Sequence, residues 1–155
     1  MRLDDVLAIL AAFEAEEVRY AVFGALALAA HGIDRATRDL DVFVAPDEEN
    51  VSRLRRALAA IFDDPSIEEI TAQDLGGEYP AVQYGPPNVD FTIDIVSRLG
   101  ETFTFDDLDV EEVAAGNATI KVVSPAMLYR MKRDTVRLRD QADAERLRQV
   151  FGFEE

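Results

Sequence analysis

Residues 22–44 read VFGALALAAHGIDRATRDLDVFV, and this stretch decides the fold. An apolar segment ends at Gly24, helix-forming residues follow, and a second apolar segment contains Asp39 and Asp41. Because side chains of a strand alternate between its two faces, these two carboxylates are expected to share one face. Without a cation, their repulsion would raise the pKa of one of them. Magnesium removes that cost, because it prefers oxygen ligands and is commonly held by one or two carboxylates and substrate phosphates.

A second acidic segment, VDFTIDIV, occupies residues 89–96 and has the alternation of a strand. Asp90, Thr92 and Asp94 are expected on one of its faces. Asp94 is preferred as a third carboxylate, either metal ligand or base, because isoleucine flanks it on both sides; Asp90 is its competitor. Three carboxylates on adjacent strands can hold two metal ions that activate an attacking hydroxyl and stabilise a leaving pyrophosphate.

Gly24 stands between an expected strand and an expected helix. The first backbone N–H groups of a helix have no partner within the helix, and they attract phosphate oxygens. A single glycine is a weak signal, but here the paired aspartates follow it at a short distance. The pattern therefore favours phosphate binding at the end of this strand.

Hydrophobic spacing predicts the remaining elements. Asp47 is expected to cap one helix, Ser124 and Pro125 to open another, and Gly32 to end a third. Residues 105–116 are expected to form a short helix and loop. The expected helices are 3–17, 25–31, 47–62, 125–135 and 139–150, and the expected strands are 19–23, 39–44, 67–71, 80–84, 89–96 and 118–123.

This order predicts an α/β, more narrowly α+β, fold in which helices flank a small mixed sheet. One domain is expected over residues 1–155, with a core at about 18–123 and C-terminal helices at about 125–150. No cysteine is present, which excludes disulfides and thiolate zinc sites. The N-terminus does not resemble a signal peptide, and no apolar run approaches the roughly 18 residues of a membrane span. A soluble, cytoplasmic protein is expected.

The charge is strongly acidic but uneven. There are 31 acidic and 16 basic side chains, a net charge of -15, which argues against broad attraction to nucleic acids or anionic membranes. Residues 130–148 contain seven basic and four acidic side chains and carry +3, so the rest of the chain carries -18. An anionic ligand is expected to be drawn to residues 130–148.

An apolar strand, a glycine with a small residue, a helix and then Asp-x-Asp in a strand together resemble the nucleotidyltransferase superfamily of the DNA polymerase β type. Further residues are similar to its small prokaryotic branch that includes the AbiEii-type toxins. The resemblance covers about residues 18–150. Those further residues are His31-Gly32, Arg35, Thr37, Arg38-Asp39-Leu40-Asp41 and, in the tail MLYRMKRDTVRLRDQAD, Lys132 followed by Arg139-Asp140-x-x-Asp143.

The resemblance implies a magnesium-dependent enzyme, with manganese as the alternative metal, that moves a nucleoside monophosphate from a nucleoside triphosphate to a hydroxyl. The acceptor would be a tRNA 3′ end, a protein or a small molecule. The protein would be a toxin with an antitoxin partner. By the same resemblance, the catalytic and metal-binding residues would be Asp39, Asp41 and Asp94, and the nucleotide-binding residues Gly24, Ala25, Arg38, Lys132 and Asp140. Ala25 stands where the family has glycine or serine, so it keeps the backbone N–H but lacks a hydroxyl.

Each of these residues also has a purely structural interpretation. Asp39 and Asp41 would face solvent at a sheet edge or pair with Arg35 and Arg38. Lys132 would lie on a solvated helix face, and the acids at 140 and 143 would stabilise a helix N-terminus. For His31, a role at a helix C-terminus is preferred over catalysis.

Two other functions remain open. The chain would be a non-catalytic binding protein or toxin–antitoxin partner with the same fold, or an acidic interaction domain without a ligand. In the last case Asp39→Asn and Asp41→Asn would leave stability unchanged or improved, with or without magnesium.

Overall fold

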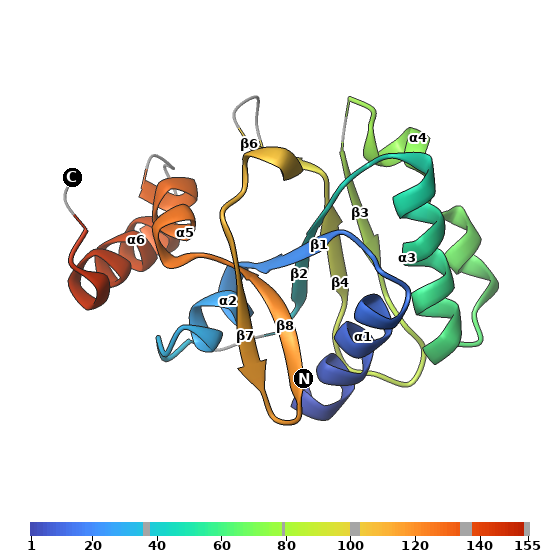
Figure 1. Cartoon of the computed structure of the whole chain (residues 1–155), viewed down its shortest axis with the longest axis horizontal. Coiled ribbons are helices and arrows are strands. Elements are labelled where there is room, and N and C mark those ends of the chain that lie inside the picture. Colours follow the sequence, from blue (N-terminus) through green and yellow to red (C-terminus); the bar gives the residue numbers. More distant parts are fainter. Residues whose placement is uncertain (36–37, 79, 100–102, 134–137, 154–155) are drawn as a thin grey trace.

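The structure is a computed structural model that describes residues 1–35, 38–78, 80–99, 103–133 and 138–153. Its described residues form a six-stranded sheet with the strand order β3-β4-β2-β1-β8-β7, and a separate two-stranded pair, β5-β6 (Figure 1). The strands are β1 Tyr20–Phe23, β2 Leu40–Val44, β3 Ala81–Tyr84, β4 Ile93–Val96, β5 Arg98–Leu99, β6 Phe103–Thr104, β7 Val110–Ala115 and β8 Ala118–Val123.

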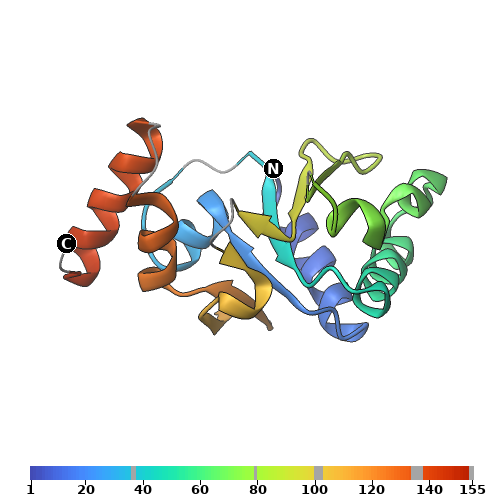
Figure 2. The same cartoon turned by 90° about the horizontal axis from the view of Figure 1, so that it is seen from above.

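Helices flank the sheet on both sides (Figure 2). The α-helices are α1 Leu3–Ala15, α2 Gly24–Ala30, α3 Glu48–Ile61, α4 Ala72–Leu75, α5 Pro125–Arg133 and α6 Leu138–Phe151, and the 3-10 helices are η1 Pro65–Glu69 and η2 Phe105–Asp107. Both views show α5 and α6 beside each other at the end of the molecule away from α3, with α2 between them and the sheet. None of the described helices is long and apolar enough to cross a membrane.

The sheet is mixed, as the sequence predicts. β1 runs parallel to β8 and β2 runs parallel to β4, whereas the pairs β1/β2, β3/β4 and β7/β8 are antiparallel. β2 lies between β4 and β1, and its residues Leu40, Val42, Phe43 and Val44 have no exposed surface. Asp41 is therefore the single polar side chain in a strand at the centre of the sheet.

Local capping explains where several helices begin and end. The Asp47 carboxylate accepts a hydrogen bond from the Asn50 N–H (3.1 Å) and opens α3, and the Ser124 hydroxyl accepts one from Met127 N–H (3.2 Å) ahead of α5. Gly32 follows α2 at φ +90°, a conformation that favours glycine. These three predictions are confirmed. The end expected for α5 at residue 135 lies outside the described residues.

Two predicted elements are wrong. Residues 67–71 do not form a strand: η1 covers most of them, because Asp64 caps it, accepting from Ser66 N–H (3.0 Å), and Pro65 favours its first turn. Residues 110–115 form strand β7 rather than helix and loop, because they pair along their whole length with β8. The strand expected over 89–96 is also shorter, since only residues 93–96 join the sheet.

Candidate active site

Three carboxylates come together at the start of two parallel strands. Asp41 of β2 is the direct partner of Asp94 of β4. Asp39 immediately precedes β2, and its Oδ1 accepts a hydrogen bond from the Thr92 hydroxyl (3.0 Å). The Leu40 N–H donates to the Thr92 carbonyl (2.9 Å), which extends the pairing of the two strands up to Asp39. The residues before β2 and β4 thus share one end of the sheet.

Asp41 titrates unusually in this arrangement. Burial raises its pKa from the ordinary 3.8 to about 7, assisted by the charge of Asp94, a hydrogen bond with Asp94 and the charge of Asp39. Lys132 acts in the opposite direction, so its ammonium lies within electrostatic reach of Asp41. Near neutral pH, Asp41 therefore holds a proton for part of the time.

Gly24 packs directly against the Asp41 carboxylate. It begins α2 at φ +70°, next to Phe23, which is the β1 partner of Asp41. A Cβ built at Gly24 would collide with Asp41 Oδ2 and stand only 2.9 Å from Asp41 Cγ. Glycine is thus required here by the backbone conformation and by the space that Asp41 occupies.

Lys132 of α5 is held by two acids of α6. Its Nζ contacts Asp140 Oδ1 at 3.3 Å and Asp143 Oδ2 at 3.1 Å. The side chains of Lys132, Asp140 and Asp143 are only 14%, 6% and 9% exposed. A solvated position for Lys132 is therefore excluded, and the two acids are not solvent-facing helix residues.

Arg35 lies in the segment between α2 and β2, and it pairs with Asp143 rather than with Asp39 or Asp41 (NH2 to Oδ2, 3.5 Å). Arg38 is exposed and forms no ion pair with the described residues. Among the described residues, Arg35 and Arg38 therefore form no salt bridges with Asp39 and Asp41. Thr37 and the side chain of Arg139 lie outside the described part.

Asp90 does not compete with Asp94 for a place beside Asp41. Its side chain is 68% exposed and pairs with the N-terminal ammonium of Met1 (3.2 Å). Ala25 is half-buried at the second position of α2. His31 is the C-terminal cap of α2, and its Nε2 donates to the Val123 carbonyl (2.8 Å), which fits the structural role expected for it.

Sequence reasoning named Arg35 only as part of the family motif and as a possible partner of Asp39 and Asp41, and it named Asp143 as part of the tail motif without a committed role. The signal for Asp143 was its spacing of three residues from Asp140, which puts both on one face of a helix. Arg35 is linked to Lys132 through Asp143, across about a hundred residues of chain, and no local pattern predicts that link.

The donor set suits a hard divalent cation. Asp41 and Asp94 are adjacent carboxylates whose closeness helps to raise the pKa of Asp41, and carboxylate oxygens are the ligands that magnesium prefers. Among the described residues, no group of three or more His, Cys, Asp or Glu side chains already has a metal-binding arrangement. The Thr92 hydroxyl engages only Oδ1 of Asp39 among the described residues, so Oδ2 would serve as the metal ligand.

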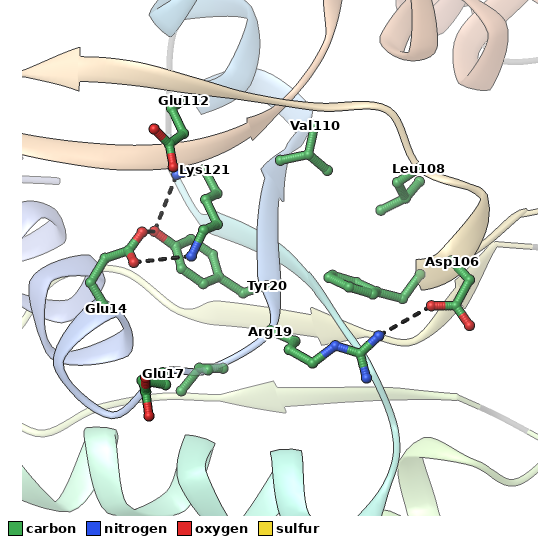
Figure 3. A pocket seen from close by; sticks show the side chains of 11 residues that line it. Glu14, Glu17, Arg19, Tyr20, Asp106, Leu108, Val110, Glu112 and Lys121 are labelled. Carbon is green, nitrogen blue, oxygen red and sulfur yellow. Dashed lines mark hydrogen bonds and ion pairs between the residues drawn. The ribbon is translucent and has the colours of Figure 1, made fainter.

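A cavity of about 720 Å³ lies elsewhere, at the opposite end of β1 (Figure 3). There Tyr20 is the partner of Val44, whereas Asp41 pairs with Phe23 at the other end of the strand. The Lys121 ammonium is paired with Glu14 (3.0 Å), which also accepts from the Tyr20 hydroxyl (3.0 Å). This cavity is separate from the three carboxylates and does not form part of the candidate site.

The mixed sheet and its flanking helices form a nucleotidyltransferase fold. The chain matches, over residues 6–151, the family model described as "Nucleotidyl transferase AbiEii toxin, Type IV TA system". It belongs to this family of nucleotidyltransferase toxins, and it is a transferase. No curated protein matches the sequence.

Two solved structures share the fold. One is TM1012 of Thermotoga maritima, which has been assigned to the nucleotidyltransferases (18% identity, TM-score 0.55), with 97% of this chain and 92% of that chain covered. The other is ANT(2")-Ia in complex with adenylyl-2"-tobramycin (14% identity, TM-score 0.58), with 96% of this chain and 88% of that chain covered. At these identities the likeness concerns the fold.

Proposed function

We propose that this nucleotidyltransferase transfers a nucleoside monophosphate from a nucleoside triphosphate to a hydroxyl group, with magnesium, or manganese in its place. The observation that carries the proposal is the pairing of Asp41 with Asp94, beside Asp39 and within reach of the charge of Lys132. Neighbouring carboxylates repel each other unless a cation lies between them. A triphosphate in turn needs positive charge from both metal ions and side chains.

In the proposed reaction, the acceptor hydroxyl oxygen attacks the α-phosphorus of the triphosphate. A bond forms between that oxygen and the phosphorus, the bond from the phosphorus to the bridging oxygen of the β-phosphate breaks, and pyrophosphate leaves. The hydroxyl proton passes to a carboxylate, for which we assign Asp94. Asp94 is assigned this role because it is the direct strand partner of Asp41 and therefore lies beside the metal site.

Asp39, Asp41 and Asp94 would hold the metal. When bound, magnesium would neutralise phosphate charge and polarise the reacting oxygens. The backbone N–H groups of Gly24 and Ala25 would contact phosphate oxygens. Lys132, with Arg38 at the surface, would supply positive charge, and Asp140 would act by holding Lys132.

Three classes of acceptor carry a suitable hydroxyl: a tRNA 3′ end, a protein and a small molecule. The net charge of -15 disfavours a long nucleic-acid contact, although residues 130–148 offer a local basic surface. ANT(2")-Ia, which shares the fold, was crystallised with an adenylylated small molecule. An antitoxin partner would follow from the toxin family.

The test is transfer of label from nucleoside triphosphates carrying ³²P at the α- or the γ-position to separated RNA, protein and small-molecule fractions of a cell extract. We expect α-label, and no γ-label, in one fraction, only with magnesium or manganese. Asp41→Asn abolishes the transfer, whereas Asp90→Asn, an exposed acid on the same segment as Asp94, retains it. Covalent transfer of γ-label would contradict the proposal, as would equal transfer by Asp41→Asn.

A further inference from the structure

A single carboxylate oxygen joins two cations from distant parts of the chain. Asp143 Oδ2 lies 3.1 Å from Lys132 Nζ on α5 and 3.5 Å from Arg35 NH2 in the segment that leads into β2. The Asp143 side chain is 9% exposed, and those of Lys132 and Arg35 are 14% and 24% exposed. The C-terminal helices are therefore tied through Asp143 to the segment that carries Asp39 and Asp41.

Arg35 also retains an unused donor. Its Nε is buried and has no hydrogen-bond partner among the described residues. Buried polar atoms are almost always paired, so this guanidinium N–H is a donor that a further acceptor group would satisfy. A guanidinium fits the paired oxygens of a phosphate better than any other side chain does.

We propose that Asp143 is a positioning residue that holds Arg35 and Lys132 side by side for the β- and γ-phosphates of the nucleotide, with Arg35 as an additional phosphate-binding residue. This inference rests on the proposed function. Lys132 and Arg35 repel each other, and the shared Asp143 oxygen offsets that repulsion where they meet. Asp140 holds Lys132 independently, so loss of Asp143 releases chiefly Arg35.

The test measures affinities by calorimetry with magnesium present, for the triphosphate among ATP, GTP, CTP and UTP that the native protein binds best and for the matching monophosphate. We expect Asp143→Asn to weaken triphosphate binding by about tenfold, since a hydrogen bond to a charged group contributes roughly that factor. Its monophosphate affinity stays within about twofold, because the base, sugar and α-phosphate contacts are unchanged. The control is Glu145→Gln on the same helix, an exposed acid paired only locally with Arg148 and Gln149 among the described residues. It binds both nucleotides as the native protein does.

Arg35→Gln tests the same link from its other side. We expect about the same loss for the triphosphate, and the double variant with Asp143→Asn to bind about as weakly as either single variant, because both act through one contact. Since residue 35 lies outside the helices and strands, Arg35→Gln still decides the matter if Asp143→Asn does not fold.

Three results would overturn the inference: Asp143→Asn binding like Glu145→Gln, equal loss for triphosphate and monophosphate, or fully additive losses in the double variant. In each case the native protein binds the triphosphate, so the proposed function survives. If the native protein binds none of the four triphosphates with magnesium, the proposed function itself fails, and the inference with it.

Discussion

Gly24 is packed against Asp41, and this contact leaves no room for a side chain at position 24. Gly24→Ala combines a positive φ, which costs other residues about 1 to 2 kcal/mol, with a collision against the Asp41 carboxylate. We expect a loss of about 2 kcal/mol or more, a fall in Tm of roughly 4 to 8 °C in thermal unfolding.

Two other glycines separate the causes of that loss. Gly32→Ala has the positive φ but open space around it, and Gly85→Ala has neither constraint. We expect an intermediate loss for Gly32→Ala and a change within about 0.5 kcal/mol for Gly85→Ala. Equal losses of stability for Gly24→Ala and Gly32→Ala would show that the Asp41 side chain moves aside at little cost.

The raised pKa of Asp41 predicts how stability depends on pH. Because its pKa rises from 3.8 when unfolded to about 7 when folded, the folded metal-free protein binds more protons between these values. The contribution of Asp41 to the free energy of unfolding is therefore greatest below about pH 4 and is lost as the pH rises through 7. Asp41→Asn removes this dependence.

Urea unfolding in a chelator at pH 5 and pH 8 measures the effect. We expect the native protein to lose about 1 to 2 kcal/mol relative to Asp41→Asn over this range, since water partly screens a half-buried carboxyl. Magnesium should restore the loss at pH 8. Parallel stability profiles against pH for the two proteins would contradict the raised pKa of Asp41.

At the scale of elements, one buried amide fastens α3 to the sheet. The Asn50 side chain accepts from the Arg19 N–H (2.7 Å) and donates to the carbonyls of Arg19 (3.1 Å) and Ala45 (2.8 Å), and it is 1% exposed. These backbone groups flank β1 and β2. Asn50 therefore ties the ends of two central strands to the first turn of α3.

Asn50→Ala leaves those backbone groups without their side-chain partner. Each buried unsatisfied group costs about 1 to 3 kcal/mol, so we expect a loss of roughly 3 kcal/mol in urea unfolding. Ser52→Ala in the same helix, where the hydroxyl accepts a hydrogen bond from the exposed Arg56, should change stability by less than about 0.5 kcal/mol. A loss at position 50 no larger than at position 52 would contradict the bracing role.

Elements with strong local signals were predictable and those defined by distant pairing were not. The buried side chains of α1, which are Val6, Ile9, Leu10 and Phe13, repeat at helical spacing, and α3 and α5 begin at their expected caps. β7 has mostly half-buried or exposed residues at the sheet edge, so its sequence carries little apolar alternation. It is a strand because β8 lies beside it, which composition does not reveal.

Across the whole molecule, the sequence indicated which acidic residues belong to the candidate site, but not which contacts bring them together. The alternation of Asp39 with Asp41, and of Asp94 with isoleucines, was visible in the chain, and so was the helical spacing of Asp140 and Asp143. The direct partnership of Asp41 with Asp94 depends on β2 and β4 running parallel in one register. The link from Asp143 to Arg35 depends on how the C-terminal helices dock, which no local pattern encodes.

The charge of the molecule is unevenly distributed between the C-terminal helices and the rest of the chain. Residues 130–148 carry a net +3, and their described parts, 130–133 and 138–148, belong to α5 and α6, which lie together at one end (Figure 1). They bring Lys132 within electrostatic reach of Asp41, although the rest of the chain carries -18. We therefore expect a triphosphate to be attracted to this end of the molecule, although the net charge of the chain disfavours polyanions in general.

The most direct test of the central claim, a metal-dependent nucleotide site at Asp41, is thermal unfolding with each of the four nucleoside triphosphates, with and without magnesium. At about 100 times its dissociation constant, a ligand stabilises by ~2.7 kcal/mol, a rise in Tm of roughly 5 to 10 °C for a chain of this size. We predict that rise for the native protein and Asp90→Asn only with magnesium, and none for Asp41→Asn. No rise with any triphosphate, or the same rise in Asp41→Asn, would contradict the account.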